Sequence, residues 1–291
     1  KAKFIKLDLL NLDELVNVMK GCEIIYHTAC TAYEGLSVFS PSLVSKNTFQ
    51  ISVNAFTAAI KVKSKRFIHC SSMARYGTQD ITPFTEDMIC KPQDPYGIAK
   101  YGAELMLKNL SETHGLELVI AVPHNIIGPR QKYDDPFRNV ASIMINLMLQ
   151  KRRPIIYGDG EQKRCFSDIE DCIYCLDKLI TDPNIISQTV NIGPDEEFIS
   201  INELFKLLSN KLQFNEKPIY TSDRPNEVKH ATCSAEKARK ILNYKTTIKL
   251  SDSLDKLINF IKKGGTKDFK YNYMLEIENE KTPSTWRKRL F

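Results

Sequence analysis

Apolar and polar positions along the first 122 residues follow two periods, one typical of buried strands and one of amphipathic helices. Short apolar runs predict strands at 4–8, 23–27, 66–71 and 116–122. Apolar residues spaced three and four positions apart predict helices at 11–20, 45–62 and 96–114, the first with the capping pair Asn11 and Glu14. Strands that alternate with helices form right-handed crossovers, so this half of the chain predicts a parallel sheet with helices on both faces.

The pattern loosens after Val122, where turn-forming residues precede a predicted helix at 137–150. Further on, the sequence predicts short strands near 155–157 and 189–191, a capped helix at 200–212 and a last helix at 250–263. We therefore expect an α/β fold with a doubly wound, parallel Rossmann-like sheet in 1–127 and a smaller α+β substrate lobe in 128–265. We expect 168–190 to return to the sheet domain and the polar tail, 266–291, to wrap the surface.

The start of the chain has an unusual pattern. The first residue is Lys1 rather than methionine, and residues 4–8 already have the pattern of a strand. We therefore expect the chain to open inside the fold, with the first βαβ unit of the sheet lying outside it.

Composition narrows the class of protein without naming a function. With 42% hydrophobic and 26% charged residues, 291 residues suit one globular unit or two closely packed ones. The net charge of +6 is spread along the chain and does not indicate nucleic-acid binding. No apolar run reaches the ~20 residues that span a bilayer and no signal peptide is evident, so we expect a soluble, cytoplasmic protein without a membrane partner.

Eight cysteines are scattered along the chain without the dense spacing of a secreted disulfide scaffold, which favours a reducing compartment. Cys172 and Cys175 form a CxxC pair, but they lie in an amphipathic helical stretch and no second pair completes four metal ligands. Two core-facing thiols are a simpler interpretation than a metal or redox site, so we expect no metal.

The first candidate for chemistry is Tyr96 with Lys100, whose four-residue spacing near the start of a helix places the phenol and the ammonium on one face. A free tyrosine has a pKa of about 10 and is a poor base at neutral pH. A nearby ammonium, helped by a positively charged nicotinamide, favours the phenolate and lowers that pKa. The pair alone is also consistent with a tyrosine at the core edge and a solvated lysine.

The second candidate is Ser72, which follows an apolar strand and precedes a tight turn. In a doubly wound sheet, ligands bind at the carboxyl ends of the strands, so this serine can face Tyr96 across a crevice. Ser72 could then hydrogen-bond the reacting oxygen while Tyr96 moves its proton. Alone, Ser72 is equally well explained as a turn or helix-cap residue.

Four motifs together resemble a known family: 71–77 (SSMARYG), 85–87 (TED), 95–100 (PYGIAK) and 125–131 (NIIGPRQ). They resemble the extended short-chain dehydrogenase/reductases, specifically the NAD-dependent nucleotide-sugar epimerase/dehydratase family and, within it, the UDP-sugar 4-epimerases. The resemblance runs from Phe4 to about Lys263. It implies that Ser72, Tyr96 and Lys100 form the catalytic triad, with Lys100 also bonding the nicotinamide ribose.

The resemblance also implies which residues hold NAD and a nucleotide-sugar substrate. The implied cofactor-binding residues are Asp8, His27, Ala29, Cys30, Asn47, Tyr96, Lys100 and Pro123. The implied substrate-binding residues are Ser72, Asn125, Asn139, Tyr157, Arg164, Arg224 and Ala231.

Local sequence supports three of the substrate positions. Arg164 and Arg224 each lie in or after a turn, and their planar guanidinium groups suit a diphosphate, while Tyr157 could stack on a base. Either arginine alone is also consistent with a solvated surface charge.

Three departures from the family pattern affect these expectations. The glycine-rich phosphate turn and the acidic residue that selects NAD over NADP are not in this chain, so NAD is inferred from the resemblance. Cys165 follows Arg164 where aspartate is common, which could loosen a support for that arginine. Pro123 occupies a position that is often aromatic and lies next to the nicotinamide.

The residues after Ser72 bear on the reaction, because dehydratases and decarboxylases of the family need a carboxylic acid there. Met73, Ala74 and Arg75 offer none, which favours 4-epimerisation of a UDP-hexose or UDP-N-acetylhexosamine by transient oxidation at C4. A 4-ketoreductase, a 3β-hydroxysteroid-type dehydrogenase and an inactive remnant that acts as a binding protein are alternatives.

Two further expectations follow from the resemblance. Ala231 matches a position that limits the pocket opposite the hexose, where alanine leaves space for an N-acetyl group. The helices at 45–62 and 96–114 often pair into a four-helix interface in relatives, so we expect a homodimer.

Overall fold

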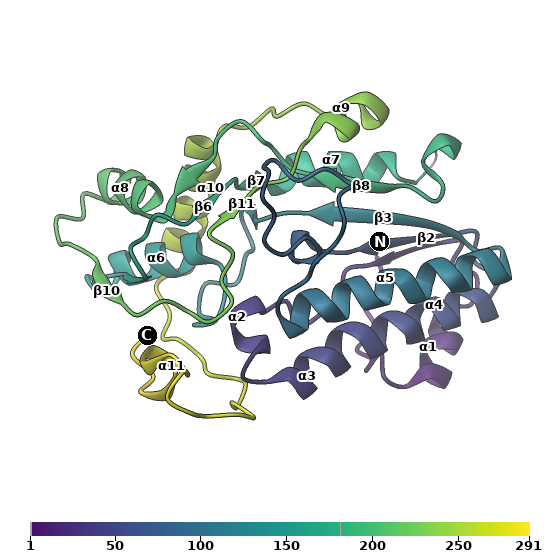
Figure 1. Cartoon of the computed structure of the whole chain (residues 1–291), viewed down its shortest axis with the longest axis horizontal. Coiled ribbons are helices and arrows are strands. Elements are labelled where there is room, and N and C mark those ends of the chain that lie inside the picture. The colour runs from purple at the N-terminus through teal and green to yellow at the C-terminus, as the bar shows by residue number, and fades with distance from the viewer. Residues whose placement is uncertain (1, 181) are drawn as a thin grey trace.

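A computed structural model describes residues 2–180 and 182–291. Its central sheet has four parallel strands in the order β1-β2-β3-β8 (Figure 1). The strands are β1 (Ile24–His27), β2 (Arg66–Cys70), β3 (Glu117–Pro123) and β8 (Thr189–Ile192). The predicted parallel α/β sheet is confirmed, and β8 returns from the second half of the chain to pair with β3.

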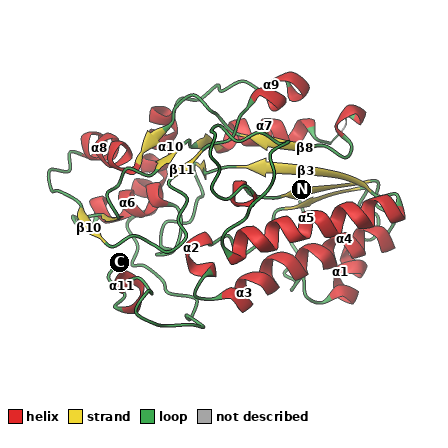
Figure 2. Ribbon diagram, in the orientation of Figure 1, coloured by secondary structure: helices red, strands yellow, loops and turns green. Residues whose placement is uncertain are grey.

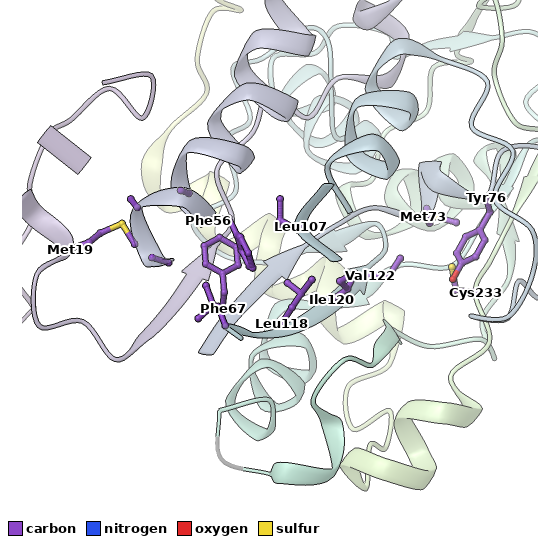
Figure 3. Packing of buried hydrophobic residues seen from close by; sticks show 14 of the residues in the cluster. Met19, Phe56, Phe67, Met73, Tyr76, Leu107, Leu118, Ile120, Val122 and Cys233 are labelled. Atoms are coloured by element: carbon purple, nitrogen blue, oxygen red, sulfur yellow. The ribbon is translucent and has the colours of Figure 1, made fainter. Parts of the chain in front are cut away.

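Helices cover both faces of this sheet, because successive side chains of a strand point to opposite sides. One face is covered by α1 (Leu12–Met19), α4 (Ile51–Lys61) and α5 (Pro95–His114), and the other by α7 (Ile169–Lys178) and α9 (Glu236–Leu242). Phe67 and Leu118 pack under the first set of helices with Phe56 and Leu107, as Figure 3 shows. Their neighbours Ile68 and Val119 pack under the second set.

The helix predicted at 45–62 is continuous but not uniform. It begins earlier, with α3 (Pro41–Ser45), passes through a π-helical turn, η1 (Lys46–Gln50), and continues as α4. The predicted cap of α1 is confirmed, since the Asn11 side chain accepts a hydrogen bond from the Glu14 backbone N–H at 3.3 Å. Cys172 and Cys175 of α7 are buried in the core, as the amphipathic pattern predicted.

The prediction of a strand at 4–8 is wrong. These residues have no regular structure, and the side chain of Phe4 is 91% exposed. A strand needs a neighbour that pairs with its backbone, and among the described residues β1 pairs only with β2. Leu7 and Leu9 still pack against the first core cluster, which accounts for the apolar pattern.

The second half of the chain forms a smaller α+β assembly (Figure 2), which has its own apolar core. Its helices are α6 (Val140–Leu149), α8 (Ile201–Leu212) and α10 (Leu250–Gly264). Its short strand pairs are β5 (Ile155–Tyr157) with β10 (Ile219–Thr221), β4 (Ile126–Ile127) with β7 (Ser167–Asp168), and β6 (Lys163–Arg164) with both β9 (Ile199–Ser200) and β11 (His230–Ala231). The predicted capping box of α8 is confirmed between Ser200 and Glu203.

Helix α6 begins three residues later than predicted. Asn139, the residue before it, has a φ of 68°, a left-handed conformation that cannot continue a helix backwards to residue 137. The single turns α2 (Glu34–Ser37), η2 (Met73–Arg75) and η3 (Pro183–Ile185) lie between larger elements, and a fourth, α11 (Ser284–Arg287), lies in the tail. No helix in the described parts of the chain is long and apolar enough to cross a bilayer.

Most residues of the tail, 266–291, are exposed, but the tail is also anchored in the interior. Its α11 lies beside α2 and below α6 in Figure 1. Trp286 of α11 is 4% exposed and packs edge-on against Phe39 and Phe137. The tail therefore joins segments from both halves of the chain.

Candidate active site

A cavity of about 550 Å³ lies where the carboxyl ends of β1, β2 and β3 face the second half of the chain. Cys30, Ser72 and Asn125, each of which follows one of these strands, line it from the sheet side. Arg164 and Arg224 line it from the other side. This is the position at which parallel α/β sheets bind their ligands.

Ser72 and Tyr96 come together because α5 starts directly against the turn after β2. Ser72 caps that turn, since its hydroxyl accepts a hydrogen bond from the Ala74 N–H at 3.2 Å. Asp94 caps α5 by accepting from the Gly97 N–H at 3.0 Å. A Cβ atom on Gly97 would lie 2.6 Å from the Ala74 carbonyl oxygen, so only glycine permits this approach. Both predicted catalytic hydroxyls are buried and line the cavity.

Lys100 lies one turn further along α5 and is 1% exposed. Its Nζ donates a hydrogen bond to the Cys70 carbonyl oxygen at 2.7 Å. An ammonium carries three donors, so two of them have no acceptor among the described residues. These free N–H groups border the cavity, where a ribose hydroxyl can accept them.

The expected lowering of the Tyr96 pKa by Lys100 is not observed in this structure. Burial raises the pKa of the Tyr96 phenol well above its usual value, and the charges of Cys30 and Glu34 raise it further, against the opposing effects of Ser72 and Arg138. The physical reason is that desolvation of the phenolate dominates, while the Lys100 ammonium turns to the Cys70 carbonyl.

A buried ion pair supports the two segments that carry these residues. Arg75, three residues after Ser72, contacts Glu104 with 3.2 Å between Nη2 and Oε2, and both side chains are at most 4% exposed. The Ser71 hydroxyl donates to the same carboxylate. Sequence reasoning missed this pair, although Glu104 stands four residues after Lys100 and therefore on the same helix face.

The structure divides the residues that were predicted to hold NAD. Cys30, Tyr96, Lys100 and Pro123 line the cavity. Asp8 and Asn47 line a separate shallow hollow beside residues 6–9. Ala29 is half-buried and His27 buried, and neither lines the cavity.

His27 is held inside the protein. Its Nε2 lies 3.0 Å from the Ser52 hydroxyl, and its ring stacks on that of His69 with 5.7 Å between the centroids. Burial, reinforced by the positive charge of Lys100, lowers the pKa of His27 to about 3. His27 therefore stays neutral at ordinary pH.

Most of the predicted substrate residues share the cavity. Asn125, Asn139, Tyr157, Arg164 and Arg224 all line it. Ala231 does not: it is 6% exposed and packs in the first core cluster, beside Tyr76 and Cys233. Its position on β11, opposite Arg164 of β6, directs it into that core. The expectation that Ala231 bounds the sugar pocket therefore has no support from the geometry.

The two arginines are tied together by Glu227, which sequence reasoning did not assign to the site. Arg224 donates to both Glu227 carboxylate oxygens, at 3.1 and 2.6 Å, and Arg164 lies 3.7 Å from one of them. Burial raises the Glu227 pKa, but Arg224 outweighs it, so the pKa lies below its ordinary value and the carboxylate is charged. The Arg224 guanidinium lies 4.9 Å from the centre of the Tyr157 ring.

Arg164 is held in place although Cys165, not the common aspartate, follows it. The Cys165 thiol accepts a hydrogen bond from Thr232, while the Arg164 guanidinium donates to the Val228 carbonyl oxygen at 2.6 Å and to the Lys229 carbonyl oxygen at 3.1 Å. Backbone carbonyls and Glu227 thus hold this arginine in place of the usual aspartate.

Comparison with known proteins identifies the family to which this architecture belongs. The family model for the NAD dependent epimerase/dehydratase family matches residues 1–193. A putative UDP-glucose 4-epimerase from Methanocaldococcus jannaschii is 31% identical over 267 residues, which are 90% of this chain and 85% of the relative. The chain belongs to the NAD-dependent epimerase/dehydratase family.

Solved structures of family members have the same fold. A UDP-glucose 4-epimerase from Thermotoga maritima, solved with UDP-glucose, superimposes with a TM-score of 0.86 at 26% identity, over 90% of this chain and 85% of that one. A UDP-glucuronic acid 4-epimerase from Bacillus cereus, solved with UDP-glucuronic acid and NAD, gives a TM-score of 0.84 at 28% identity, over 90% and 82% of the two chains. The resemblance inferred from the sequence motifs is therefore confirmed at the level of the family.

Proposed function

We propose that this protein is an NAD-dependent UDP-sugar 4-epimerase whose reaction takes place between Ser72, Tyr96 and the nicotinamide. The observation that carries the proposal is the joint position of these two hydroxyls and the Arg164–Arg224 pair in one cavity. A hydroxyl pair poised for proton transfer and a cationic pair suited to a diphosphate are the two functions that a nucleotide-sugar epimerase needs.

The residues present fit the nicotinamide end of NAD. Lys100 has two unused N–H donors at the cavity, where ribose hydroxyls would accept them, and Cys30 and Pro123 supply adjacent walls. When bound, NAD would supply the hydride acceptor and donor for C4 of the sugar. The chain contains no glycine-rich phosphate turn, so this fit concerns only the nicotinamide end of the cofactor.

The chain's own groups handle the proton. Tyr96, as phenolate, takes the proton of the sugar 4-hydroxyl as the C4 hydride leaves, and Ser72 donates a hydrogen bond to the same oxygen. Tyr96 returns the proton when hydride comes back to the other face of the 4-keto sugar. Burial raises the Tyr96 pKa, and the positive charge of an oxidised nicotinamide beside it would favour the phenolate.

Arg164 and Arg224 bind the diphosphate, and Tyr157 contacts the nucleotide. With Glu227 ionised, the two arginines and the carboxylate carry a net charge of +1, from two positive charges and one negative. Arg224 uses two of its five N–H donors on Glu227, which leaves donors for phosphate oxygens.

The substrate that we propose is a UDP-hexose or a UDP-N-acetylhexosamine. Incubation with NAD and UDP-glucose should yield UDP-galactose at equilibrium, and the N-acetylated pair is assayed in parallel by chromatography. Because the chain contains no glycine-rich phosphate turn, NAD is supplied at millimolar concentration, and failure to interconvert either pair under that condition would contradict the proposal.

We also propose a homodimer located in the cytoplasm. Ile98 and Leu105 on the outer face of α5 are 55% and 52% exposed, and an apolar helix face of this kind suits an interface between copies. All eight cysteines are free, which suits a reducing compartment. Sedimentation velocity of the parent and of Leu105→Glu tests the dimer: a parent that sediments as a monomer at micromolar concentration would refute it.

A further inference from the structure

Glu34 is a carboxylate in the wall of the cavity that the proposed reaction does not use. It is the first residue of α2, it is exposed, and it lines the cavity. Among the described residues its carboxylate has no ion-pair partner and accepts no hydrogen bond. This carboxylate is therefore available to a ligand in the cavity.

The contacts of α2 place Glu34 between the two ends of the cavity. On one side, the Ser37 hydroxyl lies 3.3 Å from the carboxylate of Asp94, which caps the start of α5, and α2 lies beside this end of α5 in Figure 1. On the other side, a Cβ atom added to Gly35 would lie 3.5 Å from Arg224 Nη1. Glu34 thus stands between the helix that carries the reacting phenol and an arginine proposed to bind the diphosphate.

The charges around Glu34 agree with this position. The negative charge of Glu34 raises the pKa of the Tyr96 phenol. The positive charges of Arg164 and Arg224 lower the pKa of Glu34, against the larger effect of burial, which raises it. Since burial dominates although the residue is exposed, its accessible surface faces the cavity and not bulk water, and salt screens its charge only weakly.

A bound UDP-hexose has to span these two ends of the cavity. In the proposed function its C4 hydroxyl meets the hydroxyls of Ser72 and Tyr96, and its diphosphate meets the pair of arginines. The hexose ring therefore lies between them, beside Glu34. A carboxylate accepts hydrogen bonds from the hydroxyls of a neutral sugar, and it repels a second carboxylate from which little water separates it.

Arg138 is a cation in the same wall that would favour a sugar carboxylate instead. Its guanidinium lies over the Tyr33 ring, 5.9 Å from the ring centre. The charge of Arg138 lowers the pKa of Tyr96, but by less than the charge of Glu34 raises it. We therefore expect the negative charge of Glu34 to dominate beside the reacting sugar.

We propose that Glu34 determines which sugar the cavity accepts: it accepts a hydrogen bond from a sugar hydroxyl and excludes sugars that carry a carboxylate at C6. The inference rests on the proposed function and deepens it, because it separates neutral UDP-hexoses from UDP-hexuronates at the same site. Family membership alone does not decide between them, since the family includes a UDP-glucuronic acid 4-epimerase.

The test compares the affinities of UDP, UDP-glucose and UDP-glucuronic acid by calorimetry, so it needs neither NAD nor turnover. Measurement at pH 8 keeps Glu34 ionised, since burial raises its pKa. The ratio of the last two affinities reports on the sugar, because both ligands carry the same diphosphate. The parent should bind UDP-glucose roughly 10- to 100-fold more tightly than UDP-glucuronic acid. Glu34→Gln keeps the shape and an acceptor but removes the charge, and it should bring the two affinities within about 3-fold of each other.

Glu112→Gln is the matched control. It removes one negative charge from an exposed position of α5 that does not line the cavity, so its ratio should equal that of the parent. Similar affinities of the parent for both sugar nucleotides, a preference for UDP-glucuronic acid, or an unchanged ratio in Glu34→Gln would overturn the inference. Binding of UDP in those experiments would leave the proposed UDP-sugar 4-epimerase function standing. A parent chain that binds no UDP at all would instead overturn the proposed function, and this inference with it.

Discussion

Replacement of Arg224 by methionine should weaken binding of the diphosphate while leaving binding of the base and ribose nearly unchanged. Methionine retains an apolar stem against Tyr157 but removes the guanidinium, whose side chain is 26% exposed. Glu227 keeps Arg164 at 3.7 Å, so the change leaves no carboxylate without a counter-charge. A charge-assisted hydrogen bond contributes ~1.5–3 kcal/mol, and one arginine on a diphosphate makes at least one such bond.

The expected loss of UDP affinity in Arg224→Met is therefore about 2–3 kcal/mol, which corresponds to roughly 30- to 150-fold. Calorimetric titration with UDP and with uridine provides the assay, because uridine has the base and ribose but no diphosphate. Uridine affinity should change by less than about 3-fold. Lys229→Met is the matched control, since Lys229 is a nearby cation whose ion pair with Asp159 is 58% exposed on both sides. Equal losses for UDP and uridine would refute the assignment of Arg224 to the diphosphate.

Three more predictions concern the reaction, cofactor binding and the buried residue His27. Tyr96→Phe should abolish turnover at saturating NAD while UDP affinity stays within about 2-fold, and a kcat similar to that of the parent would remove Tyr96 from its proposed role. The 291-residue chain should bind NAD weakly in calorimetry, because it contains no glycine-rich turn for the pyrophosphate; micromolar affinity would contradict this. The His27 pKa is lowered from 6.5 to about 3, so the folded state resists a proton that the unfolded state binds, and this part of the stability is lost as pH falls below 6.5. His27→Gln should reduce the loss of unfolding free energy between pH 7 and pH 5 by about 2 kcal/mol in urea titrations, whereas His114→Gln, at an exposed position, should not.

The central sheet and its helices could be predicted because each element carries its own local signal. The strand β3 appears in the sequence as an unbroken apolar run over 118–122, and β2, which is buried throughout, is apolar except for Arg66 and His69. The segment 4–8 has a similar run but no strand to pair with among the described residues, and pairing is a property of the whole fold, not of the segment. The same limit applies to α6, whose start depends on the backbone angle of Asn139.

The residues that line the cavity could be predicted from the sequence where they belong to a motif, and could not where a contact spans the fold. Ser72, Tyr96 and Lys100 have a fixed spacing on elements that meet at a sheet edge. Trp286 is 129 positions from Tyr157 by residue number, and its place in the cavity wall depends on how the tail crosses both halves. Ala231 shows the opposite error: its sequence position matched a pocket residue of the family, but on β11 its side chain packs in the core.

Glu227 gives the clearest link between the structure and the proposed binding of a diphosphate. Two arginines without a neighbouring carboxylate would repel each other, and their side chains would adopt several conformations. Glu227 removes most of that repulsion: it accepts two hydrogen bonds from the Arg224 guanidinium and forms an ion pair with Arg164 at 3.7 Å. Less side-chain freedom is then lost when UDP binds, and affinity rises because the arginines are ordered beforehand. Since Arg164, Arg224 and Glu227 together keep one net positive charge, this group still attracts an anionic ligand, and the carboxylate orders the arginines without competing with the diphosphate.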